Sequence, residues 1–317
     1  MTRKSAFTMA EILLSLTIIG VVAAITLPSL IGNINERAWN TQRQALHARF
    51  AQALPMMNNL SVYSSASEFI SSGLSNGIKL TNVCQQDKIE DCGINKTAIT
   101  AFDGTTKSNV DFKWTTMGLA LTDLGYSSTD TVTETDLIAG FETQNGESIV
   151  VQYNPKCTSD SESLPQNITG GEVWLNTVCV NFIYDLNGAK GPNKIGKDMG
   201  FMTAFYPTET EVVAPLITSQ VTGTASSGTQ GQANFVAAKA PACITDYRLP
   251  SKNEAKAIAL NGYYTSGTNI AASAPVVISS SKASGNGNIY YYTVEGKKVK
   301  TTLNSTTPTG ATRCVKR

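Results

Sequence analysis

The sequence predicts an α+β protein in which a long N-terminal helix, half membrane-spanning and half amphipathic, packs on a globular head with antiparallel sheet. First, residues Phe7–Leu27 carry no charge except Glu11, and a hydrocarbon core of about 30 Å needs about 20 mostly apolar residues. Second, apolar residues recur at three- and four-residue steps from Ile31 to Leu54, which is the period of an amphipathic helix. Third, the rest of the chain contains alternating segments that are typical of strands.

The composition argues against several classes of function. The chain of 317 residues has 25 Lys and Arg against 24 Asp and Glu, so its charge does not indicate a nucleic-acid partner. His47 is the one histidine, and it lies in a predicted helix beside the membrane segment. No nucleophile-elbow, HExxH, phosphate-loop or dinucleotide-binding motif occurs. We therefore expect that the protein is not an enzyme.

The first segment has three interpretations. A secretory signal would be cleaved after the apolar region, where Val22-Ala23-Ala24 is suitable. A plain membrane anchor would keep the segment but has no use for Glu11, since an acid inside a span costs at least about 2.5 kcal/mol. The preferred interpretation is cleavage before the apolar helix, with residues 1–6 as a basic leader that stays cytoplasmic.

The preferred interpretation rests on the segment Lys4-Ser5-Ala6-Phe7-Thr8-Met9-Ala10-Glu11. It resembles the processing site of type IV pilins and of type II secretion pseudopilins. The resemblance implies that a prepilin peptidase cuts between Ala6 and Phe7 and that Phe7 becomes a methylated N-terminus. Ala6 departs from the family, which usually has glycine before the cut.

Glu11 has a physical role in this interpretation. Its carboxylate gains a partner in lipid if a neighbouring subunit presents the amino group of its Phe7. Because such a pair forms at one stagger of the helices, Glu11 is expected to set register more than net stability. Gly20 and Pro28 fall where the family has a glycine and a helix-loosening proline, so residues 7–28 would be the transmembrane and later filament-core helix.

The resemblance also implies partners and a location. The partners are other pilin or pseudopilin subunits, the prepilin peptidase and the inner-membrane assembly machinery. The chain is expected in the inner membrane, as a single-pass protein, before assembly. Afterwards it is expected in a periplasmic or cell-surface filament.

The six cysteines all follow the membrane segment, which favours disulfides in an oxidising compartment. No C-x-x-C motif occurs, so a zinc site of the usual spacing is not expected. Six cysteines allow about 15 pairings, and burial of some as free thiols is an alternative. The sequential pairing is the most economical: Cys84–Cys92, Cys157–Cys179 and Cys243–Cys314.

Residues 29–55 are predicted to form the amphipathic half of the helix, which Pro55 ends or kinks. The head is assigned to residues 56–217. Val110–Trp114 alternates as a half-buried strand does, and two further segments of the head are strand-like: Glu147–Tyr153 and Glu172–Tyr184.

A polar loop, residues 185–198, follows the last of these segments. Its D-x-N-G…G-P-N…G-x-D pattern resembles a loop that recurs in pilin-like proteins. Asp185, Asn187, Asn193 and Asp198 offer the oxygen atoms that Ca²⁺ prefers, although the spacing is not that of an EF-hand. The alternative is a tight turn without metal, because Asn-Gly after a strand is a strong hairpin signal. Ca²⁺ is the one cofactor that the sequence suggests.

Residues 218–232 are low in complexity and are predicted to form a flexible loop or linker. Beyond them, Ser251 and Glu254 have the spacing of a capping box at the start of a short helix. Asn261-Gly262 is a signal for its end.

The Arg248-Leu249-Pro250-Ser251 stretch, with Glu254 and the ending Thr312–Arg317, resembles small extracellular domains with a C-type-lectin-like fold. The resemblance implies a small C-terminal subdomain at residues 233–317 and supports the pair Cys243–Cys314. No sugar-reading E-P-N or Q-P-D triplet occurs, so calcium-dependent glycan binding is not expected.

Two functions of different class follow. The first is a structural subunit, a minor pilin or pseudopilin, assembled through its N-terminal helix. The second is a surface-binding or adhesion module that uses the C-terminal domain and keeps the helix as an anchor. Only the first function needs Glu11.

Overall fold

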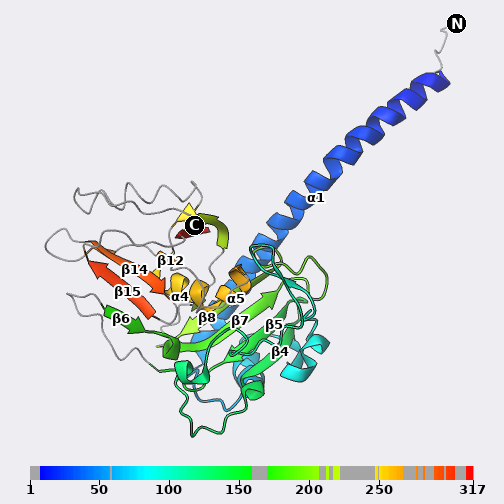
Figure 1. Ribbon diagram of the computed structural model, residues 1–317. Helices are drawn as coiled ribbons and strands as arrows, with labels where there is room; N and C mark the ends of the chain where they lie inside the picture. Colours follow the sequence, from blue (N-terminus) through cyan, green and yellow to red (C-terminus); the bar gives the residue numbers. More distant parts are fainter. Residues whose placement is uncertain are drawn as a thin grey trace. The chain divides into compact units, whose positions relative to one another are not determined.

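The computed structural model describes residues 8–57, 59–158, 170–206, 212–213, 217–221, 247–248, 250–266, 276–277, 281–282, 289–295, 298–303 and 312–316. These residues form a mixture of helices and antiparallel sheet with an apolar N-terminal helix (Figure 1), so the predicted α+β class is confirmed. The chain divides into two compact units, residues 1–45 and residues 46–317.

Helix α1 spans Met9–Ala53 without interruption. It ends where the sequence predicts, because Pro55 lies in the 3₁₀ turn Leu54–Met56 and has no N–H for a further helical bond. The last turns of α1 belong to the second unit, and their side chains Leu46 and Phe50 are fully buried.

Within the second unit, the stripe residues Leu46, Phe50 and Leu54 are fully buried. The periodicity therefore identifies the buried side of the last helical turns correctly.

The second unit is built on a six-stranded antiparallel sheet in the order β1-β4-β5-β7-β8-β9 (Figure 1). The strands are β1 (Leu80–Gln85), β4 (Ile138–Thr143), β5 (Ser148–Tyr153), β7 (Val178–Asp185), β8 (Met199–Phe205) and β9 (Val212–Val213).

Both faces of this sheet are covered, which is why every residue of β5, β7 and β8 is buried. On one face Phe50 of α1 lies against Phe182 of β7, and Phe69 stacks on Tyr153 of β5. On the other face lie α4 (Lys252–Leu260) and α5 (Gly262–Ser266), whose buried side chains share a core with Ile183. Strands buried on both sides read as continuous apolar runs rather than as alternation.

Short helices and turns surround the sheet. They are α2 (Ala66–Glu68), the π-turn Phe69–Gly73 and the 3₁₀ segments Leu74–Asn76, Gln86–Cys92, Leu121–Leu124, Glu134–Leu137 and Leu175–Thr177. The hairpin of β2 (Ile99–Thr100) and β3 (Thr106–Lys107) forms a separate two-stranded sheet.

The remaining strands form two further antiparallel sheets, described here by their backbone. One has the order β10-β16-β11, with β10 (Ile217–Val221), β16 (Thr312–Lys316) and β11 (Tyr247–Arg248). The other has the order β12-β14-β15-β6, with β13 also on β14. Its strands are β12 (Val276–Val277), β13 (Ser281–Lys282), β14 (Ile289–Glu295), β15 (Lys298–Leu303) and β6 (Gly170–Val173).

One sequence prediction is wrong. Val110–Trp114 is not a strand: Val110, Phe112 and Trp114 are buried as the alternation suggests, but Phe112 has φ +58°, which an extended ladder does not accept. The first residues of the predicted linker 218–232 lie in strand β10, since Ile217–Val221 pairs with β16. The rest of that linker lies outside the described residues.

The described residues of the predicted C-terminal subdomain, 233–317, lie in the unit 46–317, and Leu260, Tyr264 and Val315 lie in the same core cluster as residues of the head sheet. The apolar face of the short helix α4 is therefore completed by the head.

Two disulfides, Cys84–Cys92 and Cys157–Cys179, are formed among the described residues. They are the first two pairs of the sequential arrangement. The third pair, Cys243–Cys314, involves Cys243, which lies outside the described residues.

Candidate functional site

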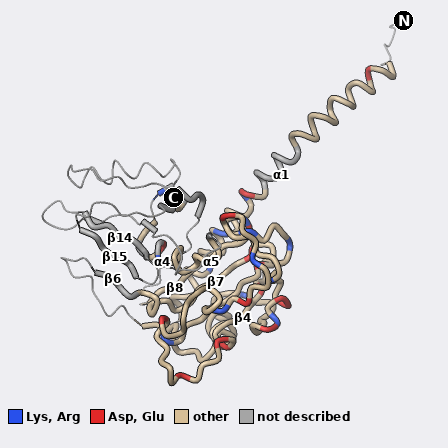
Figure 2. The backbone as a smooth tube through the Cα atoms, viewed as in Figure 1, with Lys and Arg blue, Asp and Glu red and all other residues tan. Residues whose placement is uncertain are grey.

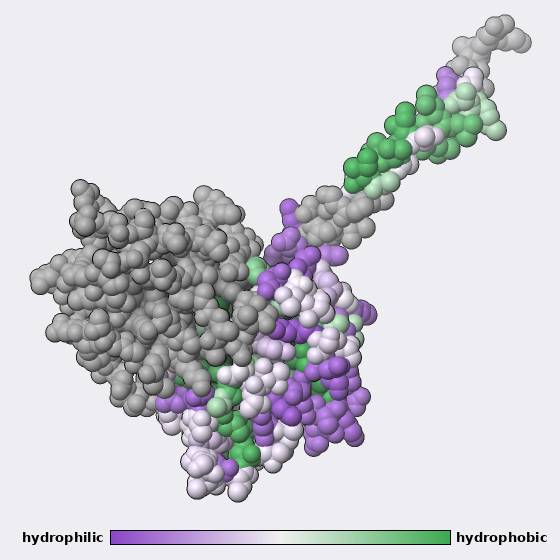
Figure 3. Space-filling view, viewed as in Figure 1, coloured by the Kyte–Doolittle hydropathy of each residue, from purple (hydrophilic) through white to green (hydrophobic). Residues whose placement is uncertain are grey.

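Two candidate sites follow from the sequence, one at the start of α1 and one in the loop 185–198. The first belongs to an apolar helix. Residues Met9–Thr26 are long and apolar enough to cross a membrane, a property shared with signal sequences, and none of them is buried (Figure 3). Glu11 is the one charged residue in this window, near the N-terminal end of α1 (Figure 2).

Glu11 is held by Thr8 within its own chain. Glu11 Oε2 accepts hydrogen bonds from the backbone N–H of Thr8 at 2.8 Å and from the Thr8 hydroxyl at 2.9 Å. The Glu11 N–H in turn lies 3.3 Å from Thr8 Oγ1. This reciprocal arrangement is a capping box, which satisfies backbone donors that a helix start leaves open. Thr8 was not among the predicted site residues, although its Thr-x-x-Glu spacing to Glu11 is a local signal for a capping box.

Three hydroxyl groups farther along the described part of α1 also have partners inside the chain. Ser15 donates to the carbonyl of Ile12 and Thr17 to that of Leu13. Thr26 donates to the carbonyl of Val22. Because lipid offers no hydrogen bonds, a helix whose polar side chains are satisfied internally suits a bilayer.

The other predicted residues of the N-terminal site are placed as follows. Ala6 and Phe7 lie outside the described residues. Gly20 lies within α1, and a Cβ atom added there would meet no heavy atom within 4 Å. Pro28 is part of the continuous helix.

The second candidate site is the loop between β7 and β8. Asp185 ends β7, and its Oδ1 accepts the N–H of Asn187 at 3.1 Å. Asp198 lies just before β8 and is fully buried. Its two oxygens accept the N–H groups of Asn193 and Lys194, each at 2.8 Å. The two acids therefore organise the two ends of the same loop.

Three side-chain oxygens of this loop are buried without a hydrogen-bond partner: Asp185 Oδ2, Asn187 Oδ1 and Asn193 Oδ1. Asp185 is 1% exposed and Asn193 is 7% exposed. Buried oxygens without a donor cost about 1–3 kcal/mol each, and more if charged. All three belong to residues that the sequence analysis named as Ca²⁺ ligands.

The charges of the loop also bear on whether it binds a cation. Burial, together with the negative charge of Asp198, raises the pKa of Asp185 to about 8, although hydrogen bonds from Asn187 and Gly188 oppose the rise. Two buried acids in one loop favour protonation of one acid or the binding of a nearby cation.

The donor set fits a hard cation. Two carboxylates and two amide oxygens are ligands that Ca²⁺ accepts, with carbonyls or water completing its usual coordination of about six to eight oxygens. In the described part of the chain, no group of three or more His, Cys, Asp or Glu side chains is placed to hold a metal. Any metal here would therefore depend on the asparagine oxygens as well as on the two acids.

A buried polar network on the sheet was not foreseen from the sequence. Asn181 of β7 donates to Gln152 at 2.6 Å and to Asn261 at 2.9 Å, and it accepts from Thr203 at 2.8 Å. All four side chains are fully buried. The sequence signal at Asn261-Gly262 indicated the helix end correctly but gave no hint of partners on the sheet.

Comparisons with protein-family models, with curated proteins and with solved structures find no match for this chain.

Proposed function

We propose that the chain is a filament subunit of the pilin or pseudopilin type, held in the membrane by α1 before assembly. The observation that carries this proposal is the exposed apolar window Met9–Thr26 of α1, whose single acid, Glu11, is hydrogen-bonded to Thr8. Neutral donors satisfy the carboxylate of an isolated subunit without neutralising its charge. The amino group of a neighbour's Phe7, freed by cleavage after Ala6, would add the missing positive charge.

This arrangement separates residence in the membrane from assembly. The capping box lowers the cost of holding Glu11 at the edge of a bilayer, because the carboxylate keeps two donors. Assembly then requires the helices to slide until the acid meets a neighbour's amine, so the pair selects one register. The long helix, packed by its C-terminal turns on the head, would carry the head at the outside of the filament.

The proposal is tested with Glu11→Ala, with Glu36→Ala as a matched control on the same helix outside the apolar window. We expect normal membrane insertion, cleavage to a methylated Phe7 by mass spectrometry, and loss of incorporation into filaments for Glu11→Ala alone. A mature protein that begins near Ala24, or that keeps Met1, would contradict the proposal. Normal incorporation of the variant would instead favour the anchored binding module.

We also propose that the loop 185–198 binds Ca²⁺, through Asp185, Asn187, Asn193 and Asp198. The three buried oxygens without donors support this second proposal. A cation in the loop would give these oxygens a partner and would offset the negative charge of the two acids.

Binding is measured on the full chain by thermal unfolding with Ca²⁺ or a chelator and by terbium luminescence. We expect a higher Tm with Ca²⁺, and loss of the shift in Asp185→Asn. Asp91→Asn is a suitable control, since Asp91 is an exposed acid outside this loop. An unchanged Tm with no terbium signal would leave the loop as a turn without metal.

A further inference from the structure

We infer that the loop 185–198 is coupled to the helix pair α4–α5 through the hairpin β2–β3, so that Ca²⁺ in the loop tightens the attachment of α5 to the head. The inference rests on the proposed Ca²⁺ site. Two physical connections, both within residues 46–317, carry it.

The first connection starts at Thr100 of β2. Its N–H donates to the carbonyl of Asn193 at 2.9 Å, and its carbonyl accepts the N–H of Ile195 at 2.9 Å. Thr100 thus pairs in parallel with Lys194 at the centre of the loop. Strand β2 is therefore hydrogen-bonded to the loop at Asn193, one of the candidate ligands.

Asn193 connects the cation and the hairpin directly. Its side-chain oxygen is one of the three without a donor, its N–H binds Asp198, and its carbonyl binds Thr100. Its φ of +48° is a conformation that few residues other than glycine and asparagine adopt readily. A ligand that fixes the Asn193 side chain therefore fixes the carbonyl that Thr100 uses.

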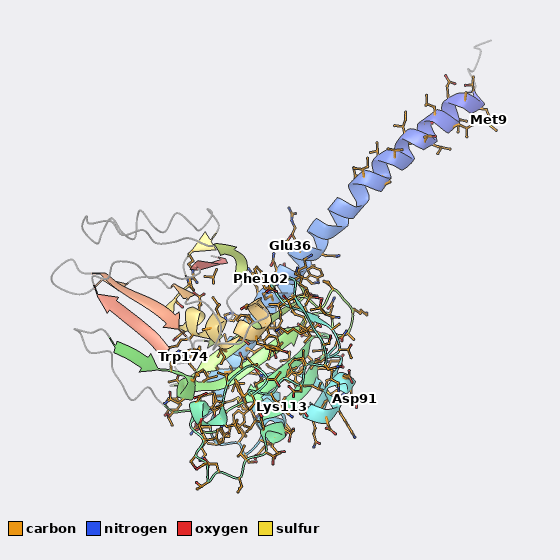
Figure 4. All side chains as sticks on the ribbon, in the orientation of Figure 1. Met9, Glu36, Asp91, Phe102, Lys113 and Trp174 are labelled. Atoms are coloured by element: carbon orange, nitrogen blue, oxygen red, sulfur yellow. A yellow bond between two sulfur atoms is a disulfide. The ribbon has the colours of Figure 1, made fainter. Side chains whose placement is uncertain are left out.

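The other end of the hairpin holds α5. The N–H of Phe102 donates to the carbonyl of Tyr264 at 3.1 Å, and the N–H of Asp103 donates to that of Thr265 at 3.3 Å. The ammonium group of Lys107 lies 3.9 Å from the centre of the Tyr263 ring. Figure 4 shows Phe102 beside the short helices of this region.

The second connection runs along β7. Asp185 ends this strand, and Asn181, four residues earlier on the same face, binds Asn261 between α4 and α5. Asn261 also accepts the N–H groups of Tyr264 and Thr265 on its carbonyl. The loop is therefore connected to α5 by two routes. One route runs through the hairpin to the carbonyls of Tyr264 and Thr265. The other runs along β7 through Asn181 to Asn261, the residue that precedes α5.

Amide hydrogen exchange on the full chain in detergent tests the inference, with Ca²⁺ and with a chelator, while terbium luminescence reports occupancy separately. Couplings between sites commonly change an equilibrium by about 5- to 150-fold. We expect Ca²⁺ to slow exchange at Phe102, Asp103 and the α5 amides by at least about fivefold. The Gln144 amide, which bonds to Lys79 away from the hairpin, is the internal control and is expected to change little.

Two variants sharpen the test. Asp185→Asn is expected to remove the effect of Ca²⁺ on α5. Lys107→Met, which removes the ammonium group over Tyr263 but no loop residue, is expected to leave terbium binding intact and to reduce the protection of α5.

The outcomes separate this inference from the site on which it rests. Terbium binding with unchanged α5 exchange would overturn the coupling and leave the Ca²⁺ site standing. Slowing of equal size at Gln144 would overturn it too, since it would indicate global stabilisation. Absence of terbium binding would overturn both.

Discussion

Asn181 of β7 and Asn261, at the junction of α4 and α5, exchange two side-chain hydrogen bonds of 2.9 and 3.1 Å at a fully buried position. Eighty residues separate the two amides along the chain. The pair joins the C-terminal helices to the sheet by groups that water would otherwise satisfy. The pair therefore favours a single packing position of α4 and α5 on the sheet.

Replacing either member is expected to destabilise the head. Asn261→Ala leaves the buried amide of Asn181 short of a donor and an acceptor, which costs about 1–3 kcal/mol. The double variant with Asn181→Ala is expected to cost less than the sum of the two single changes, because the pair is lost only once. Chemical unfolding of the full chain measures these differences. Asn82→Ala, at an exposed position, is the control and is expected to stay within about 0.5 kcal/mol.

Phe50 is the clearest test of how α1 contributes to the second unit. Its ring lies 4.6 Å from that of Phe182 and is fully buried. Phe50→Ala is expected to lower the free energy of unfolding by about 3–5 kcal/mol, because it removes an aromatic ring and leaves a cavity. Met56→Ala, at a 71% exposed residue just after α1, serves as the control. An equal loss in both variants would contradict the packing of Phe50.

These residues also indicate what the sequence could predict. Phe50 was predictable because helical periodicity and Pro55 are local signals, and the capping box at Ser251 and Glu254 forms as expected. The network around Asn181 was not, since an asparagine in a strand does not reveal a partner that arrives from a distant helix. The same limit applies to Thr100, whose role in the candidate Ca²⁺ loop depends on a two-residue strand.

The candidate site residues also differ in how far a local sequence pattern could identify them. Asp185, Asn187, Asn193 and Asp198 lie in one contiguous loop, so their spacing alone brought them together. Thr8 was detectable from a local motif and was overlooked. Arg49, which the periodicity places between apolar positions, pairs with the buried Glu147 on the hairpin of β4 and β5, a contact that no local pattern specifies.

Glu254 gives the head a defined response to acid. Burial alone would raise its pKa, but the ion pair with Arg248 at 2.6 Å and the hydrogen bonds from Ser251 outweigh burial and lower the pKa below 4.5. The ionised carboxylate therefore stabilises the folded state above about pH 4.5, and this contribution is lost as the pH falls through the lower folded-state value.

The free energy of unfolding is expected to fall more steeply in the native chain than in Glu254→Gln between about pH 5 and about pH 3. Parallel profiles for the native chain and Glu254→Gln would contradict the assignment. Ser251→Ala removes the other half of the capping box and is expected to cost about 1 kcal/mol near neutral pH.

Gly20 distinguishes contacts within a subunit from contacts between subunits. Apart from its chain neighbours and the backbone of its own helix, no heavy atom of the chain lies within 4 Å of a Cβ at this position, so Gly20→Leu is expected to create no clash in an isolated subunit. It is even expected to favour the helix by nearly 1 kcal/mol, since glycine is a poor helix former. A loss of filaments in this variant must then come from a neighbouring helix that approaches closely at Gly20.

The measurement compares membrane insertion, cleavage and filament yield for Gly20→Leu with those for Val21→Leu on the adjacent side of the helix. We expect normal insertion and cleavage in both variants and a several-fold lower filament yield in Gly20→Leu alone. Equal yields would place the Gly20 face of α1 away from the helix contacts of the filament. Because Glu11→Ala tests charge pairing and Gly20→Leu tests close approach, failure of both variants to assemble would indicate that register and packing are required together.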